Sequence, residues 1–264
     1  MNLSFNEEQT EEQPTPPVSP TPHTDVVVDE KLVNPLVTYT LIAITVLIYL
    51  LQAGSQLLIG TDIPAVLGMK INEYIMAGQF WRLLTPMFLH GSLLHIGFNM
   101  YALVVIGSGL ERRFGHWRFL LLYVLGSLGG NVFSFLLSSN PSLGASTSIF
   151  GLLGAEMVFF YQNRKLFGAG ARRALQNVIT VAAINFVIGL SPGIDNWGHL
   201  GGLVGGLIFT WFGGPKLNLA GQYPNFSVID EHTLQDQMIG AGLVILFFGG
   251  LAAAKIIGVL PNLP

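Results

Sequence analysis

Seven long apolar stretches, nearly free of charge, constrain this chain more than any other feature of its sequence. A bilayer core about 30 Å thick needs roughly 20 mostly apolar residues for each helical crossing. Because 51% of the residues are hydrophobic and only 10% are charged, an ordinary soluble domain is excluded. The sequence predicts an all-α, polytopic transmembrane helix bundle in a lipid bilayer, with spans near residues 36–58, 92–110, 119–138, 146–163, 174–191, 197–213 and 238–259.

Residues 1–34 differ from the rest, because they are rich in proline, acids and threonine without a sustained apolar pattern. Such a composition predicts a disordered cytosolic tail. The tail has no basic region followed by a short apolar one, so we expect no cleavable signal peptide and a location in the cell membrane. The net charge of -3 without a basic stripe argues against nucleic acid as a partner, and the lack of cysteine excludes thiol catalysis.

Basic residues in the short loops predict the orientation, since positively charged loops stay in the cytosol. The rule places the N-terminus and the linker 214–237 inside, and the loop 59–91 and the end of the seventh span (238–264) outside. Three residues oppose it: Lys70, Arg82 and Lys255. The predicted orientation depends on the basic residues of two loops, between spans two and three and between spans four and five. They are Arg112, Arg113, Arg118, Arg164, Lys165, Arg172 and Arg173.

In this topology spans two, four and six all begin at the outer face, and these ends carry the unusual polar residues of the chain. Polar groups in lipid are costly and tend to face a cavity, so a functional site is the default hypothesis. We therefore expect one site that opens to the outer face. Its candidate residues are His90, His95, Asn99, Ser146 and His199.

Ser146 is the candidate nucleophile. Gly144 and Ala145 precede it and are small enough for a tight turn, and a serine at a helix N-terminus lies beside unpaired backbone N–H groups. Those groups and the positive helix end can stabilise an oxyanion formed by attack of the hydroxyl on a carbonyl. The alternative is that Ser146 only caps the helix, a role for which Thr147 and Ser148 are equally suited.

His199 is the candidate general base and acid. Small residues surround it in the segment GHLGGLVGG, and such a face lets two membrane helices approach closely. A neutral imidazole beside Ser146 can take the serine proton and return it to the leaving amine. The alternative is a histidine that only hydrogen-bonds a neighbouring helix. Asp195 is expected in the outer loop rather than as a third catalytic group.

His95 and Asn99 are four residues apart on one helix, so both side chains can point at one spot, as donors of an oxyanion hole do. A structural pair between helices is the alternative. Glu156 lies about ten residues beyond Ser146, roughly 15 Å along the helix, and is therefore expected outside this site.

These residues resemble the motifs of the rhomboid family of intramembrane serine proteases over about Val37 to Gly213. The family's GxS motif falls on Gly144 to Ser146, and its second-helix motif falls on His90, His95 and Asn99. Further matches are Trp81–Arg82 in the first external loop, Glu111 and Arg113 after the second helix, and His199, Gly202 and Gly206 in the sixth.

The resemblance implies a six-helix protease core over 35–213, followed by a seventh helix. It also implies a Ser146/His199 dyad, an oxyanion hole formed by His95, Asn99 and the Ser146 amide, and cleavage of single-pass membrane proteins without metal or cofactor. Thr147 stands where the family commonly has glycine, which predicts an altered rate or substrate choice. Phe150 keeps an aromatic ring for packing on His199.

Three other classes of function agree less well with the sequence. A non-catalytic rhomboid-like protein that binds membrane clients keeps the fold, but intact Ser146 and His199 argue against it. A channel or transporter is disfavoured because the chain shows no convincing internal repeat or paired interrupted helices. A metalloprotease of the HExxH type is excluded because that motif does not occur.

Overall fold

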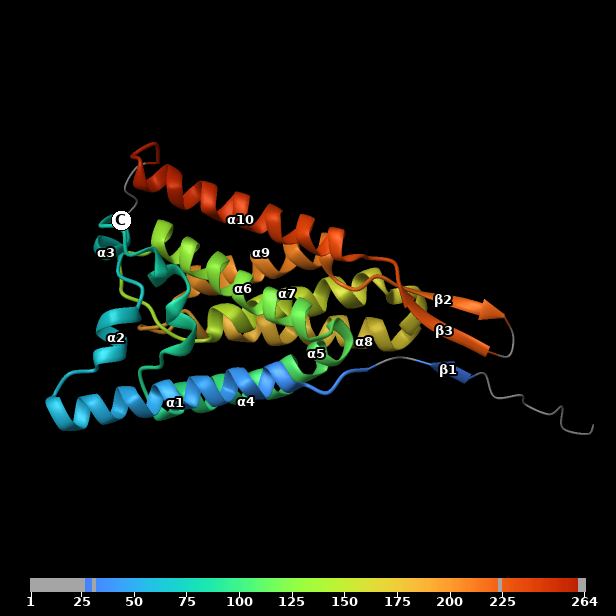
Figure 1. Cartoon of the computed structure of the whole chain (residues 1–264), viewed down its shortest axis with the longest axis horizontal. Helices are drawn as coiled ribbons and strands as arrows, with labels where there is room; N and C mark the ends of the chain where they lie inside the picture. The colour runs from blue at the N-terminus through green and yellow to red at the C-terminus, as the bar shows by residue number, and fades with distance from the viewer. Residues whose placement is uncertain (1–26, 30–31, 223–224, 261–264) are drawn as a thin grey trace, which may run out of the picture.

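The computed structural model describes residues 27–29, 32–222 and 225–260. It confirms the predicted helical bundle, in which long helices lie side by side along the molecule (Figure 1). The second predicted span is built from two helices joined by a π-helical turn at Leu103–Gly107. The long elements are α1 (Leu36–Ile59), α4 (Leu93–Ala102) with α5 (Ser108–Phe114), α6 (His116–Leu137), α7 (Ser146–Gln162), α8 (Arg164–Ile188), α9 (Asn196–Gly213) and α10 (Leu234–Ile256).

Four helices of the described residues are long and apolar enough to cross a bilayer by length and composition: α1, α4–α5, α6 and α10. The other three predicted spans coincide with α7, α8 and α9, which do not meet that standard. Helix α7 has only 17 residues, and α8 begins with basic residues in the segment predicted as a loop. A non-helical backbone at Gly168 interrupts α8 near its start. Length and composition thus identify four candidate crossings among the described residues, and the remaining three stay predictions.

Glycine residues let α6, α7 and α9 pack at the centre of the bundle with their backbones almost in contact. A Cβ atom added at Gly129 of α6 would lie 2.7 Å from the carbonyl oxygen of Gly201 on α9. One added at Gly126 would lie 3.1 Å from the Cα atom of Gly151 on α7. Glycine at these positions lets α6 pack closely against both α9 and α7. A Cβ atom added at Gly202 or Gly206 of α9 would likewise collide with the backbone of α7, the helix that begins at Ser146.

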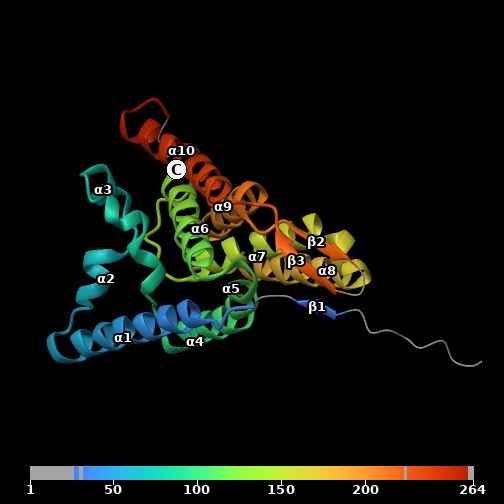
Figure 2. The same cartoon turned by 45° about the vertical axis from the view of Figure 1, so that its right-hand side comes forward.

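The seventh helix, α10, packs against the core rather than standing apart from it. The Phe248 side chain is fully buried and lies over Gly129 of α6, and Gly240 approaches Gly213 of α9. A capping box formed by Thr233 and Asp236 starts the helix. This arrangement appears in both views, where α10 runs along α9 and α6 (Figures 1 and 2).

The loop between α1 and α4 folds into two short helices, α2 (Ile63–Gly68) and α3 (Asn72–Met76), followed by two 3-10 turns. Trp81 is half exposed and donates to the carbonyl of Leu67 at 3.0 Å. Arg82, the second residue of the Trp81–Arg82 pair, is buried. It donates to the carbonyl of Met69 at 2.7 Å and stacks over Tyr74. Arg82 therefore donates to backbone carbonyls of the loop and stabilises its conformation.

Glu111 fastens the start of α1 to the end of α5. Its buried carboxylate accepts the backbone N–H groups of Val37 at 2.8 Å and Thr38 at 2.7 Å, which are orphan donors at the first turn of α1. It also accepts the hydroxyl of Thr38 at 2.6 Å and lies 2.6 Å from the Nδ1 atom of His116. A buried carboxylate is tolerated here because hydrogen bonds from four donor groups compensate its desolvation.

Strands in the segment predicted as a cytosolic linker form a small sheet at one end of the bundle. Strands β2 (Leu217–Gln222) and β3 (Asn225–Asp230) make an antiparallel hairpin, and β1 (Val27–Asp29) pairs with β3 in parallel. The prediction that the tail is disordered up to residue 34 is therefore wrong at Val27–Asp29, where backbone pairing and two β-favouring valines give a strand. Residues 1–26 and 30–31 lie outside the described part of the chain.

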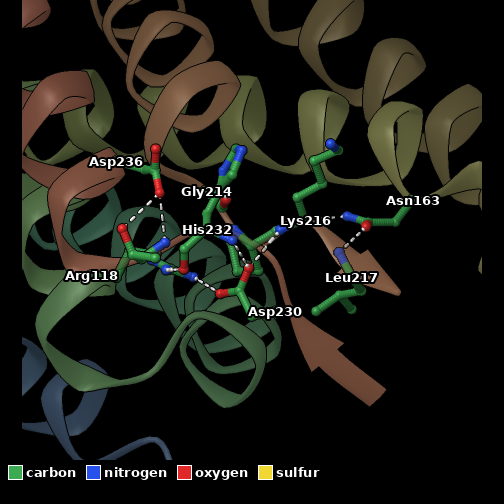
Figure 3. A network of polar contacts seen from close by, with 10 residues as sticks. Arg118, Asn163, Gly214, Lys216, Leu217, Asp230, His232 and Asp236 are labelled. Atoms are coloured by element: carbon green, nitrogen blue, oxygen red, sulfur yellow. Dashed lines mark hydrogen bonds and ion pairs between the residues drawn. The ribbon is translucent and has the colours of Figure 1, made fainter. Parts of the chain in front are cut away.

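Polar contacts attach this hairpin to the helix ends (Figure 3). Arg118 at the start of α6 forms an ion pair with Asp230 at 2.6 Å. Asn163, which follows α7, donates to the carbonyl of Pro215 at 3.0 Å and accepts from the N–H of Leu217 at 2.6 Å. The hairpin is thus part of the folded body, at the end of α7 away from Ser146.

Candidate active site

Ser146 and His199 meet across the contact between α7 and α9. The Oγ atom of Ser146 lies 3.0 Å from the Nε2 atom of His199, which is hydrogen-bond distance. His199 is 7% exposed, whereas Ser146 is half-buried. The Ser146 side chain makes no cap, because Ala145 is the N-cap residue of α7 and has no side-chain bond to the helix. The hydroxyl is therefore oriented by the imidazole and not by the helix end.

Aromatic rings hold the His199 imidazole in place. The ring of Phe150, one turn after Ser146, stacks on it with centroids 4.2 Å apart and planes 10° apart. Phe186 of α8 packs edge-on against Phe150 at 5.0 Å. The predicted packing of an aromatic ring on His199 is thus present in the structure. These rings exclude solvent from one face of the imidazole and limit its rotation.

Asp195 caps α9 and does not bond to His199. Its Oδ1 atom accepts the N–H of Gly198 at 2.9 Å, as an aspartate at an N-cap does. The Nδ1 atom of His199 has no partner among the described residues. The pair is therefore a dyad in this structure, without a carboxylate that orients the histidine directly.

Gly144 shapes the turn before Ser146. Its φ angle of 136° is rarely adopted by residues with a side chain, and its N–H donates to the carbonyl of Pro86 at 2.9 Å. A Cβ atom at this position would lie 2.8 Å from the Nε2 atom of His95 and 3.7 Å from the Oγ atom of Ser146. Gly144 thus leaves open the space that His95 and Ser146 share.

His95 presents a donor to that space. The backbone N–H of Gly91 points at the Nδ1 atom of His95 at 3.4 Å, so Nδ1 is the acceptor. In a neutral imidazole the other nitrogen, Nε2, then carries the proton. The first N–H groups of α7 have no acceptor within their own helix and lie beside Ser146. Together these groups are suited to stabilise negative charge on an oxygen bound near Ser146.

Asn99 lies on the same face of α4 as His95 and is buried. Its amide nitrogen donates to the backbone carbonyl of His95 at 2.9 Å, which leaves one N–H of the amide for another acceptor. His90 is also buried, and its ring packs edge-on against that of His95 with centroids 4.9 Å apart. The predicted polar residues of spans two, four and six therefore gather at one end of the bundle.

Glu156 lies apart from this group, as predicted, in the second half of α7, where its side chain is half-buried. No group of three or more potential metal ligands occurs within residues 27–29, 32–222 and 225–260. The residue that sequence reasoning missed is Gln52 on α1, whose side chain contacts the backbone of His90. The available signal was weak, because the apolar span 36–58 contains two glutamines, Gln52 and Gln56.

The fold and the site define a multi-pass membrane protein with a serine–histidine pair between two closely packed helices. The family model described as the Rhomboid domain matches residues 77–216, which is more than half of the chain. The chain belongs to the rhomboid family, as the motifs predicted. The matched region contains every predicted site residue, whereas α1, the hairpin strands and α10 lie outside it.

Several curated proteins are similar to this chain. Rhomboid protease GluP of Bacillus subtilis (strain 168) is 40% identical over 174 residues, or 66% of this chain and 34% of that protein. RHOMBOID-like protein 9, chloroplastic, of Arabidopsis thaliana is 35% identical over 60% of this chain and 37% of its own length. Inactive RHOMBOID-like protein 8 of the same plant is 34% identical over 48% of this chain and 36% of its own length. The chain thus spans about a third of the length of these relatives, which include a named protease and a named inactive protein.

Proposed function

We propose that the chain is an intramembrane serine endopeptidase that cleaves single-pass membrane proteins in or near their transmembrane segment. The observation that carries the proposal is the 3.0 Å contact between Ser146 Oγ and His199 Nε2. A serine hydroxyl becomes a useful nucleophile when a neutral base can take its proton as it attacks. His199 is held in that position by stacking on Phe150.

The proposed reaction proceeds through an acyl-enzyme. Ser146 Oγ attacks the scissile carbonyl carbon, and its proton passes to His199 Nε2. The carbonyl oxygen becomes an oxyanion, stabilised by His95 Nε2–H, the free Asn99 N–H and the first N–H groups of α7. His199 then gives the proton to the leaving amine as the C–N bond breaks. Water, deprotonated by His199, hydrolyses the ester and restores the Ser146 hydroxyl.

The proposed orientation puts the N-terminus in the cytosol and the dyad near the outer face, because free basic residues gather at the opposite end. Substrate then enters from the lipid between helices, while water arrives from the outer surface. The segment from Leu190 to Asn196 contains Gly193, whose φ angle is positive, and is proposed to act as a movable cap. Cross-linking this segment to its neighbours is expected to slow cleavage, and unchanged cleavage would refute the gating role.

The test is cleavage of a panel of single-pass model substrates by the purified chain in liposomes. The native chain and Ser148→Ala are expected to cut, whereas Ser146→Ala and His199→Ala are expected to be inactive. Ser148 is the matched control, because it is a buried hydroxyl on the same helix that does not contact His199. A native chain that binds these substrates and cuts none of them supports the alternative, a non-catalytic rhomboid that holds membrane clients.

A further inference from the structure

A second histidine, His90, contacts the backbone turn that carries Ser146. The backbone N–H of Ala145, the residue directly before Ser146, points at the Nε2 atom of His90 at 3.4 Å. This nitrogen must therefore be the unprotonated acceptor of the ring. His90 is 1% exposed. The His90 ring thus helps to hold the backbone before the nucleophile, together with the bond from the N–H of Gly144 to the carbonyl of Pro86.

His90 is in turn held by a single side chain of α1, Gln52, which is 2% exposed. The Oε1 atom of Gln52 accepts the backbone N–H of His90 at 3.0 Å, and its Nε2 atom donates to the His90 carbonyl at 3.3 Å. The same amide nitrogen donates to the Oδ2 atom of Asp62 at 2.8 Å. Gln52 thus bonds both backbone polar groups of His90 while Asp62 fixes the orientation of its amide.

Asp62 is itself anchored, because its Oδ1 atom accepts the N–H of Ala65 and so caps α2. The chain of contacts therefore runs from the external loop through Asp62, Gln52 and His90 to Ala145, the neighbour of the nucleophile. Helix α1 lies at the edge of the bundle, beside α4 (Figures 1 and 2). Residues far from the dyad thereby reach the backbone that orients Ser146.

We propose that Gln52, oriented by Asp62, is a positioning residue that holds His90 and through it the backbone turn before Ser146. The inference rests on the proposed protease function. Gln52 touches neither substrate nor dyad, so it acts on the geometry of the nucleophile and not on the chemistry itself. Its loss is expected to misplace Ser146 and to lower the turnover number.

An adjoining cavity makes this expectation specific. A space of about 490 Å³ lies between α1, the external loop and the start of α4, and Gln52, Asp62 and His90 are among the residues that line it. Because the space is already open, truncating the Gln52 amide gives His90 room to move toward it. Gln56 lines the same space one turn further along α1, with an exposed side chain that makes no bond to His90. It provides a matched control.

The experiment compares Gln52→Leu with Gln56→Leu in liposomes, using a cleavable single-pass substrate and measuring kcat, KM and the thermal midpoint. For Gln52→Leu we expect kcat to fall by about 10- to 100-fold with KM within about twofold, since small misplacements of catalytic groups carry losses of this order. Gln56→Leu should keep native kcat. Equal losses in the two variants, or an effect confined to KM, would overturn the positioning role.

A charge-matched pair tests the contact between Gln52 and Asp62. Gln52→Glu alone puts two carboxylates within hydrogen-bond distance, which is unfavourable. Adding Asp62→Asn restores a donor to that contact and keeps an acceptor for the N–H of His90, so the double variant is expected to recover part of the lost kcat. A double variant no better than Gln52→Glu contradicts the proposed orientation by Asp62.

A structural readout separates failure of this inference from failure of the proposed function. Nitrogen NMR of labelled histidine in the Ser146→Ala background reports which His90 nitrogen is unprotonated, and this does not require activity. If Gln52 positions His90, the Nε2 atom of His90 is unprotonated in the native sequence and its signal changes in Gln52→Leu. An unchanged signal overturns the positioning role of Gln52 even if the chain is a protease. A native chain that cuts nothing but shows the change overturns only the protease.

Discussion

Gly202 of α9 offers the sharpest test of how helix packing sets the dyad. A Cβ atom added there would collide with the backbone carbonyl oxygen of Thr147, the residue after Ser146. Ordinary carbon–oxygen contacts lie at about 3.3 Å or more, so α9 and α7 must separate by about 1 Å to admit the methyl group of Gly202→Ala. His199 lies three residues earlier on the same helix and moves with it.

This shift predicts two effects of different size. Overpacking costs about 1–3 kcal/mol and the better helix propensity of alanine returns about 1 kcal/mol, so we expect a net loss of about 0–2 kcal/mol in unfolding free energy. The 3.0 Å contact between His199 and Ser146 lengthens toward about 4 Å, beyond hydrogen-bond distance. Displacements of that size lower the rate by about 10²-fold, so activity should fall far more than stability.

The assay pairs kcat on a single-pass substrate with unfolding in detergent, and Gly242→Ala is the matched control. Gly242 lies on α10, and a Cβ atom there meets nothing within 4 Å. That variant is expected to keep native kcat and to lose no stability. If Gly202→Ala keeps more than half of the native kcat, then close approach of α9 to α7 does not position His199, and the reasoning from backbone contact is wrong.

Two further predictions concern groups around the site. Phe150→Leu removes the ring that stacks on His199, a contact that contributes about 0.5–1.5 kcal/mol, so kcat should drop about two- to tenfold and Phe150→Tyr should restore it; equal rates for all three would refute the role of the ring. Burial lowers the pKa of Lys70 in the external loop from 10.5 to about 8. The unfolded chain therefore binds more protons between about pH 8 and 10.5, and stability should rise with pH over that window by up to about 1.4 kcal/mol per pH unit. Lys70→Met should abolish this rise in denaturant titrations, and a slope equal to the native one would contradict the assignment.

The helical part of the fold could be predicted from the sequence because apolar length is a local property. The predicted spans 36–58, 146–163 and 197–213 agree closely with α1, α7 and α9. The hairpin of β2 and β3 was missed for the opposite reason. Its attachment depends on Arg118 and Asn163, which lie 112 and 52 residues away from their partners in the sequence. No pattern within residues 214–237 predicts contacts with residues so distant in the sequence.

The candidate site could also be predicted in part from the sequence. Alternating crossings imply that spans two, four and six begin at one side, so residues as distant as Ser146 and His199 could be expected together. The catalytic roles of both, and of His95 and Asn99, stay predictions. Gln52 was not found, because recognising it requires the rotation of α1 about its axis. An apolar span with two amides, Gln52 and Gln56, does not show which of them faces the core. A buried amide is read correctly only when its partners are known.

The three basic residues that run against the charge bias have a common structural explanation. Lys70, Arg82 and Lys255 are 0%, 3% and 6% exposed. Lys70 donates to the carbonyl of Ser138 at 2.9 Å, and Lys255 donates to that of Phe135 at 2.7 Å. Both carbonyls belong to the end of α6, where the last carbonyls lack helical partners and the helix dipole is negative.

These three side chains therefore stabilise the fold by donating to backbone carbonyls, and they are not exposed loop charges. The positive-inside rule counts basic residues that lie near the ends of spans, because these residues would have to cross the bilayer if the orientation were reversed. The exposed residues that satisfy this condition are Arg112, Arg113, Arg164, Lys165, Arg172 and Arg173, all between spans two and three or four and five. Once the three buried cations are removed from the count, no basic residue of the external loop opposes the proposed orientation, with the N-terminus in the cytosol and Ser146 near the outer face.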